Sequence, residues 1–198
     1  MSRRLSTFLA VGVAALLLVP AALAVRVHVR VEGKTQTIFG STEPTLTVKA
    51  NALDALDAAS LAGEFYYHVT FASFGAYVDQ IGRYAAGGSS GWDFKVNGVL
   101  PPVGADAVTL KDGDRVLWYW ATFGVSAGPP TLLLQSTRRN CYRVLAQDDA
   151  GKKRPARGAL LHVGRRSVRT RTGSACIGRH SGLVTATLKG AIRSNAVR

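Results

Sequence analysis

Acidic side chains and histidines are scarce in this sequence of 198 residues. It holds 12 aspartates and glutamates against 25 lysines and arginines, and its 4 histidines are scattered without the spacing of metal ligands. No nucleophile with a neighbouring base and no acid/base pair stands out, so the sequence predicts neither an enzyme nor a metal site. With 47% apolar and 8% aromatic residues, the chain is expected to fold into one medium or two small domains.

Hydrophobic runs long enough to cross a membrane are also missing. The longest, at residues 8–19, has about 12 residues where a spanning helix needs about 20. It follows Arg3 and Arg4 and precedes the small-residue site that ends at Ala24, which is the pattern of a secretory signal peptide. We therefore expect residues 1–24 to be cleaved and the mature chain to be secreted or held at the cell surface. An uncleaved membrane anchor is the alternative.

Cysteine is limited to two residues, Cys141 and Cys176. In an exported protein an even number of cysteines predicts a disulfide bridge. Closing a loop of about 35 residues would stabilise the fold by about 4 kcal/mol on the chain-entropy model. Two free thiols are the alternative.

The basic excess belongs to one end of the chain. Residues 131–198 hold 15 basic and 2 acidic side chains, whereas residues 25–130 hold 8 and 10. Such a surplus attracts an anionic envelope polymer or lipid headgroups, and a merely solvated surface is the alternative. Export argues against nucleic acid as the partner. The candidate contact residues are Lys152, Lys153, Arg154, Arg157, Arg165, Arg166, Arg169 and Arg171.

The patterns of the first mature half predict an α+β domain with a mostly antiparallel sheet and one helix. Apolar and polar residues alternate strictly over 25–31, as in a half-buried strand. Asn51 can cap a helix that Gly63 ends. Further strands are expected at 45–48, 66–71, 76–81, 92–96 and 115–123. Residues 25–123 are thus one predicted domain.

The second half lacks a helical period. A segment rich in glycine and proline at 124–130 is the predicted linker. Beyond it, short apolar stretches alternate with turns over residues 131–198, which favours a small all-β sandwich.

The strand expected at 115–123 is apolar on both faces. Because side chains alternate along a strand, Trp118 and Trp120 share one face while Leu117 and Tyr119 share the other. In a small sheet with one helix, the second face needs cover from a ligand, a partner or the neighbouring domain. Burial of both faces within the protein itself is the alternative. The face that carries Trp92 and Phe94 likewise belongs either to the hydrophobic core or to a ligand pocket.

The segment from residue 91 to 118 carries a recognisable pattern. It reads Gly-Trp-Asp-Phe-Lys-Val-Asn-Gly at 91–98, then has Pro102 and Gly104-Ala105, and then reads Leu-Lys-Asp-Gly-Asp at 110–114 before Val116 and Trp118. Upstream lie the 51–59 helix and Gly-Ala-Tyr-Val-Asp-Gln-Ile-Gly at 75–82. Over about half of the chain, this resembles the bacterial family related to the C-terminal domain of transcobalamin and intrinsic factor.

This resemblance implies a non-catalytic domain with a β-grasp-like fold that binds a corrinoid-like or another flat ligand. In the vertebrate vitamin carriers the corresponding domain covers one face of cobalamin with aromatic and apolar residues near its Trp-x-Phe strand. Trp92, Phe94 and Leu100 match those positions. The helical barrel that forms the other half of the carriers' site has no counterpart here. The candidate ligand-binding residues are Trp92, Phe94, Leu100, Trp118, Tyr119 and Trp120.

Residues 131–198 look similar to the carboxypeptidase-regulatory or transthyretin-like sandwiches of bacterial surface proteins. Asp149-Ala150-Gly151, Pro155 and the stretch 185–194 suggest this likeness. For the whole chain we expect an exported binding protein for a small molecule or an envelope component. The alternative is an envelope interaction or adhesion module, in which the apolar patch meets a protein and the basic domain holds an anionic polymer.

Overall fold

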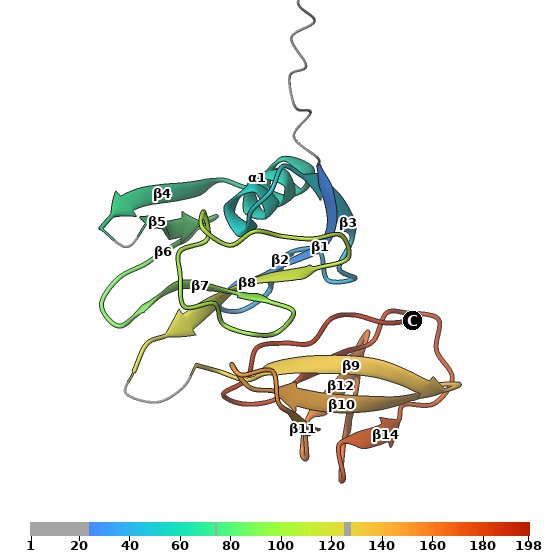
Figure 1. Cartoon of the computed structure of the whole chain (residues 1–198). Coiled ribbons are helices and arrows are strands. Elements are labelled where there is room, and N and C mark those ends of the chain that lie inside the picture. Colours follow the sequence, from blue (N-terminus) through green and yellow to red (C-terminus); the bar gives the residue numbers. More distant parts are fainter. Residues whose placement is uncertain (1–23, 74, 125–127) are drawn as a thin grey trace, which may run out of the picture.

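The computed structural model describes residues 24–73, 75–124 and 128–198 (Figure 1). The predicted signal peptide lies outside the described residues except for Ala24, and so does the middle of the predicted linker, 125–127. The described chain forms an N-terminal part, residues 25–124, and a C-terminal part, residues 128–198. Each part has a hydrophobic core of its own.

The N-terminal part is built around a five-stranded sheet. Its strands are β1 (Val25–Glu32), β2 (Thr37–Phe39), β3 (Thr45–Val48), β7 (Ser90–Val96) and β8 (Arg115–Thr122). They lie in the order β2–β1–β8–β7, and β3 also pairs with β1. The central pair β1 and β8 is parallel, whereas the other pairs are antiparallel. A smaller antiparallel sheet of β4 (Tyr67–Ala72), β5 (Gly75–Ile81) and β6 (Tyr84–Ala85) lies beside it.

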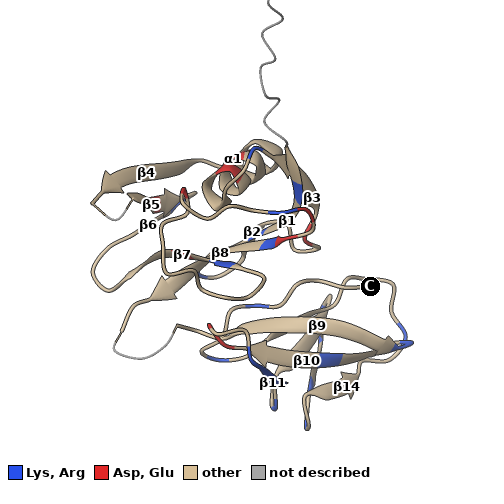
Figure 2. Ribbon diagram, in the orientation of Figure 1, with Lys and Arg blue, Asp and Glu red and all other residues tan. Residues whose placement is uncertain are grey.

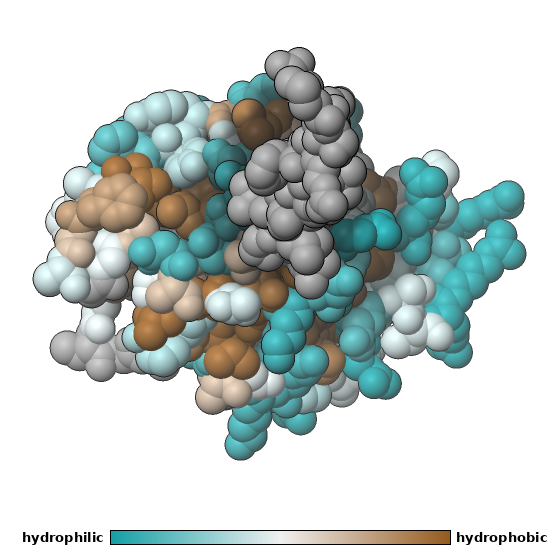
Figure 3. All heavy atoms as spheres, turned by 45° about the horizontal axis from the view of Figure 1, so that its top comes forward, coloured by the Kyte–Doolittle hydropathy of each residue, from teal (hydrophilic) through white to brown (hydrophobic). Residues whose placement is uncertain are grey.

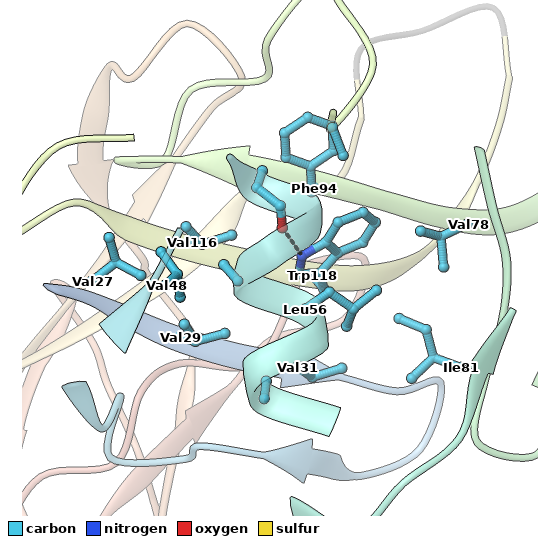
Figure 4. Packing of buried hydrophobic residues seen from close by; sticks show 14 of the residues in the cluster. Val27, Val29, Val31, Val48, Leu56, Val78, Ile81, Phe94, Val116 and Trp118 are labelled. Carbon is cyan, nitrogen blue, oxygen red and sulfur yellow. Dashed lines mark hydrogen bonds between the residues drawn. The ribbon is translucent and has the colours of Figure 1, made fainter. Parts of the chain in front are cut away.

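Helix α1 (Ala52–Gly63) begins after Asn51, the N-cap that the sequence indicated, and this residue is part of a capping box. The Asn51 side chain accepts from the backbone N–H of Asp54 at 2.8 Å, and the Asp54 carboxylate accepts from the backbone N–H of Asn51 at 3.1 Å. The buried face of α1 consists of Ala52, Ala55, Leu56 and Ala59. These mostly small side chains let the helix lie close to the valines of β1 and to Trp118 (Figure 4).

The phenol of Tyr67 connects β4 to this helix by donating to Asp57 Oδ1 at 3.0 Å. Partial burial, followed by the hydrogen bond and the negative charge of Asp57, raises the pKa of Tyr67 from 10.0 to about 12. The stability that the protonated Tyr67 hydroxyl contributes is therefore fully present below pH 10 and is lost as the pH rises through about 12. In an absorbance titration of the tyrosines, Tyr67→Phe should remove a step near pH 12. The same substitution at the exposed neighbour Tyr66 should leave that step in place.

The C-terminal part is a sandwich of two small antiparallel sheets. One sheet contains β9 (Thr131–Arg138), β10 (Cys141–Gln147), β11 (Lys153–Pro155) and β14 (Ser174–Cys176), and the other contains β12 (Leu160–Val163), β13 (Arg166–Arg169) and β15 (Thr185–Thr187). Their core between the sheets includes Leu132, Tyr142, Val144, Leu161 and Ala186. The whole described chain is thus β-rich with one helix, in agreement with the sequence prediction. The β-grasp assignment stays a prediction.

The predicted disulfide between Cys141 and Cys176 is present. The sulfur atoms are 2.04 Å apart, and the two residues are direct partners across β10 and β14. Because β14 is only three residues long, the bridge fixes a strand that would otherwise depend on few hydrogen bonds.

The second face of β8 is covered by the C-terminal part. Leu117, Tyr119 and Ala121 are buried there together with Ile192. The apolar pattern of β8 required a ligand, a partner or the neighbouring domain to cover this face. Along this stretch of β8, the neighbouring part of the chain covers it.

Strand β1 differs from its prediction for the same reason. Its alternation of apolar and polar residues predicts one solvent-exposed face, yet Arg30 and Glu32 on that face are each only 2% exposed. Arg30 donates to Glu32 at 3.2 Å, and Glu32 also accepts from Arg193 Nε of the C-terminal part at 2.9 Å. Glu43 lies 3.3 Å from Arg30 and 2.7 Å from Arg115. A network of opposite charges, with Arg30 and Glu32 buried at its centre, thus replaces solvent on this face.

Candidate functional site

An aromatic groove opens in the N-terminal part between the two sheets. It has a volume of about 400 Å³ and is lined from β5, from β7, from β8 and from the loop that follows β7. Its lining residues are Ala76, Tyr77, Val78, Trp92, Asp93, Phe94, Leu100, Pro101, Pro102, Val103, Gly104, Ala105, Trp118 and Phe123. We call this surface the aromatic groove.

The aromatic rings at the base of the groove are held rigidly. Phe94 and Trp118 stack with ring centroids 5.1 Å apart and planes 27° apart (Figure 4). The two indole N–H groups at the base of the groove are used within the fold: Trp92 donates to the carbonyl of Tyr84 at 2.8 Å, and Trp118 donates to that of Ala52 at 3.3 Å. With their polar atoms engaged, these rings leave only apolar surface for the groove.

The rim of the groove is the more accessible part. Val103 is 50% exposed and Phe123 is 43% exposed, whereas Trp92, Phe94 and Trp118 are 2–6% exposed. Figure 3 shows hydrophobic residues gathered on one side of the molecule and long hydrophilic side chains projecting on the other. A ligand would therefore touch the rim extensively and reach only small areas of the indoles and of the Phe94 ring.

The six predicted ligand-binding residues divide between two surfaces. Trp92, Phe94, Leu100 and Trp118 line the aromatic groove. Tyr119 and Trp120 line a different cleft of about 410 Å³, which also includes Glu32, Lys34 and the segment 190–193. Tyr119 lies on the opposite face of β8, while the Trp120 ring packs edge-on against Trp92 with centroids 5.6 Å apart.

Sequence reasoning missed the opposite wall of the groove. Tyr77 and Val78 of β5 lie there, and Pro101, Pro102 and Val103 form the loop. The Gly-x-Tyr-Val element at residues 75–78 was a signal for the first two, because it belongs to the resemblance that pointed to Trp92. The exposed apolar side chain of Phe123, just after β8, gave no such signal.

One carboxylate, Asp93, lies between the groove and the junction of the two parts. Its oxygens accept from the backbone N–H of Phe94 at 2.8 Å and from the Tyr119 hydroxyl at 3.3 Å. Burial raises the pKa of Asp93 above its ordinary value, and burial followed by the charge of Asp93 raises the pKa of Tyr119. The pKa of Tyr77 is also raised, again first by burial.

The eight predicted basic residues lie on several elements of the C-terminal part. Lys153 lines a cavity of about 230 Å³ at the junction, together with Arg30 and Arg115. Arg165 and Arg166 lie at the turn between β12 and β13. The other five are Lys152, Arg154, Arg157, Arg169 and Arg171, all of them exposed.

The six arginines of this predicted basic set have no acidic partner among the described residues. Arg169 donates to the carbonyl of Gly158 at 3.0 Å, and Arg166 donates to that of Arg179 at 2.9 Å. Lys and Arg are spread over the C-terminal part, whereas most Asp and Glu lie in the N-terminal part (Figure 2). This distribution leaves the sandwich strongly positive on its solvent side.

No cluster of three or more His, Cys, Asp or Glu side chains that could hold a metal ion occurs in residues 24–73, 75–124 and 128–198. Within the same ranges we find no helix with the length and hydrophobicity that a membrane span requires.

A family model described as a domain of unknown function, DUF4430, matches residues 50–122. This match covers less than half of the chain. The match extends from the N-cap region of α1 to the end of β8 and contains all of the residues that line the aromatic groove except Phe123. Strands β1 to β3 and the sandwich lie outside the DUF4430 match. No curated protein matches the chain.

Proposed function

We propose that this protein is an exported, non-catalytic binding protein whose aromatic groove holds a flat, largely apolar ligand. The observation that carries the proposal is the groove itself, in which stacked rings and a proline-containing loop enclose a volume suited to a small molecule. Except for Phe123, the groove falls within the DUF4430 match, in the segment that resembles the transcobalamin C-terminal family. Corrinoids and tetrapyrroles are therefore the ligand classes to test first.

The disulfide supports the exported location in this proposal. Structural disulfides form and persist in oxidising compartments, outside the cytosol. The bridge between Cys141 and Cys176 links two strands of a small sandwich, which is where such a bridge contributes most to stability. The signal peptide proposed for residues 1–24 would provide the route.

Tryptophan fluorescence tests the proposal, because all three tryptophans lie in the N-terminal part and two of them line the groove. A corrinoid or a tetrapyrrole should quench the emission saturably. Leu100→Arg, which places a charge in the groove, should weaken binding by at least about tenfold, or about 1.4 kcal/mol. Leu61→Arg is the matched control, because Leu61 is 75% exposed and lies outside the groove. Absence of saturable quenching across the panel, or equal loss in both variants, would contradict the proposal.

A second candidate function rests on the arginines of the sandwich that have no acidic partner among the described residues. An envelope interaction module would use them to hold an anionic polymer, while the exposed rim of the groove meets a protein. The long arginine forks suit phosphates and carboxylates, and such binding weakens with salt. Retention on anionic envelope material that does not weaken between low and high salt would count against it.

A further inference from the structure

Lys95 of β7 is a fully buried lysine at the junction between the two parts, with 0% exposure. Its Nζ lies 2.7 Å from Asp149 Oδ1, and it donates to the carbonyl of Pro129 at 2.9 Å and to Thr131 Oγ1 at 3.3 Å. It also lies over the Tyr119 ring, 5.1 Å from the centroid. Lysine is almost never fully buried unless it is paired, so this position needs an explanation.

The Asp149 carboxylate is held in place by the backbone. Its Oδ2 accepts from the N–H of Gly128 at 2.7 Å, and the carbonyl of Asp149 accepts from the N–H of Leu100 at 3.0 Å. Its Oδ1 is buried without a hydrogen bond. The short contact with Lys95 Nζ therefore does not have the alignment of a hydrogen bond. Lys95 Nζ thus lies against the Asp149 carboxyl group, in which the contacted Oδ1 is bonded directly to Cγ.

A second carboxyl group, that of Asp93, is connected to this pair through Tyr119: its Oδ2 accepts from the Tyr119 hydroxyl at 3.3 Å, and Lys95 Nζ lies over the same ring. Asp93 precedes Lys95 by two residues on β7 and therefore lies on the same face of the strand. The charges of Lys95 and Asp149 both act on Asp93, and burial raises its pKa above the ordinary value. The group is thus suited to take up and return a proton at this site.

From this arrangement we propose that Lys95 and Asp149 join in an intramolecular amide bond, with Asp93 as the proton carrier. The linkage covalently connects β7 of the N-terminal part to the turn after β10 of the C-terminal part. It lies beyond the proposed ligand binding, because it concerns the junction and not the groove.

The reaction needs no oxidant or other co-reactant. Asp93 accepts one proton from the Lys95 ammonium and passes it to Oδ1 of Asp149, which leaves a neutral amine beside a neutral carboxyl group. The Nζ lone pair attacks Cγ to form the C–N bond, Asp93 carries a second proton from Nζ to the Oδ1 hydroxyl, and the C–Oδ1 bond breaks as this oxygen leaves as water. An ammonium and a carboxylate thus become one amide and one water. The Gly128 N–H at Oδ2 stabilises the negative charge that develops on this oxygen.

Fixed geometry supplies the driving force. Amide formation between free groups in water is unfavourable, but groups held in reactive contact react as if at about 10⁵–10⁸ M. The burial of Lys95 keeps bulk water away from the product. The unjoined ion pair would also carry the desolvation cost of a buried charge, which the neutral amide removes.

Peptide mass spectrometry of the reduced, denatured and trypsin-digested protein tests the proposal. Trypsin does not cleave after a lysine whose Nζ is in an amide. We expect segment 84–111 joined to segment 144–152, with a combined mass lower by one water, in place of free 84–95 and 96–111. Recovery of free 84–95 and 144–152 at their unmodified masses would overturn the proposal, whatever the ligand binding shows.

Variants assign the roles of the groups. Asp149→Ala should abolish the joined peptide, whereas the matched neighbour Asp148→Ala should retain it, and a link that survives Asp149→Ala would overturn the assignment. Asp93→Asn should leave the amide unformed while tryptophan emission shows that the fold is retained, and Asp93→Glu should restore it. Full joining in Asp93→Asn would overturn the role of Asp93.

Discussion

Glu32→Gln should lower the free energy of unfolding by about 3–5 kcal/mol, because it removes the charge that compensates two arginines at the junction. The Glu32 carboxylate lies 3.2 Å from Arg30 and 2.9 Å from Arg193, and Thr37 donates to it at 3.0 Å. Arg30 is 2% exposed, so its charge would remain buried with only Glu43 as a counter-charge. The remaining contact, at 3.3 Å, lies on a different nitrogen of the guanidinium.

Urea unfolding followed by tryptophan emission measures this loss, because the three tryptophans all report on the N-terminal part that contains Glu32. The matched control is Glu64→Gln, at an exposed glutamate that makes no ion pair within the described residues. Replacing Arg30, Glu32 and Arg193 together by methionine, leucine and methionine should recover most of the stability. A Glu32→Gln variant as stable as the Glu64→Gln control would show that the network contributes little.

Replacing Cys141 and Cys176 together by alanine should cost about 4 kcal/mol of stability, since the bridge closes a loop of 35 residues in a sandwich with a small core. The bridge joins β10 to β14, whose three residues otherwise gain little from pairing. Unfolding of the C-terminal part should therefore move to lower urea concentration. The C-terminal part contains no tryptophan, so its unfolding is followed by far-ultraviolet circular dichroism and not by tryptophan emission.

Reduced wild-type protein should match the double alanine variant, and Ser174→Ala on the same short strand is the control for a local side-chain change. The tryptophan transition should move less than the circular dichroism transition, because the cysteines lie outside the N-terminal part. An unchanged circular dichroism transition after reduction would mean that the sandwich core alone holds β14.

Local patterns predicted the elements whose signals are local. The strand at 25–31 and the helix after Asn51 both appear, the latter with the capping box that its sequence allows. The burial of Arg30 and Glu32 could not be predicted in this way. Their partner Arg193 lies 161 residues from Glu32, and a period-two pattern says nothing about what covers its polar face.

The candidate site was predictable in part. Trp92, Phe94 and Leu100 came from a resemblance in one segment, and that segment forms one wall of the groove. Strand alternation already places Trp118 and Tyr119 on opposite faces, so one site could not contain both rings. The wall that β5 contributes depends on how the two sheets pack, which no single strand encodes.

The contact between Lys95 and Asp149 lay beyond sequence reasoning altogether. The alternation of residues 92–96 assigns Lys95 to a solvent-facing position, and the turn around Asp149 is polar. Only the docking of the sandwich against β7 brings the two side chains together.

Amide chemical-shift mapping during titration with a corrinoid or tetrapyrrole tests the central claim, that the aromatic groove is the ligand site, most directly. We expect the largest shifts at the amides of residues 76–78, 100 and 103–105, on the two walls of the groove, and small shifts at residues 190–193 in the other cleft. Shifts concentrated at 190–193, or no saturable shifts on either surface, would contradict the account.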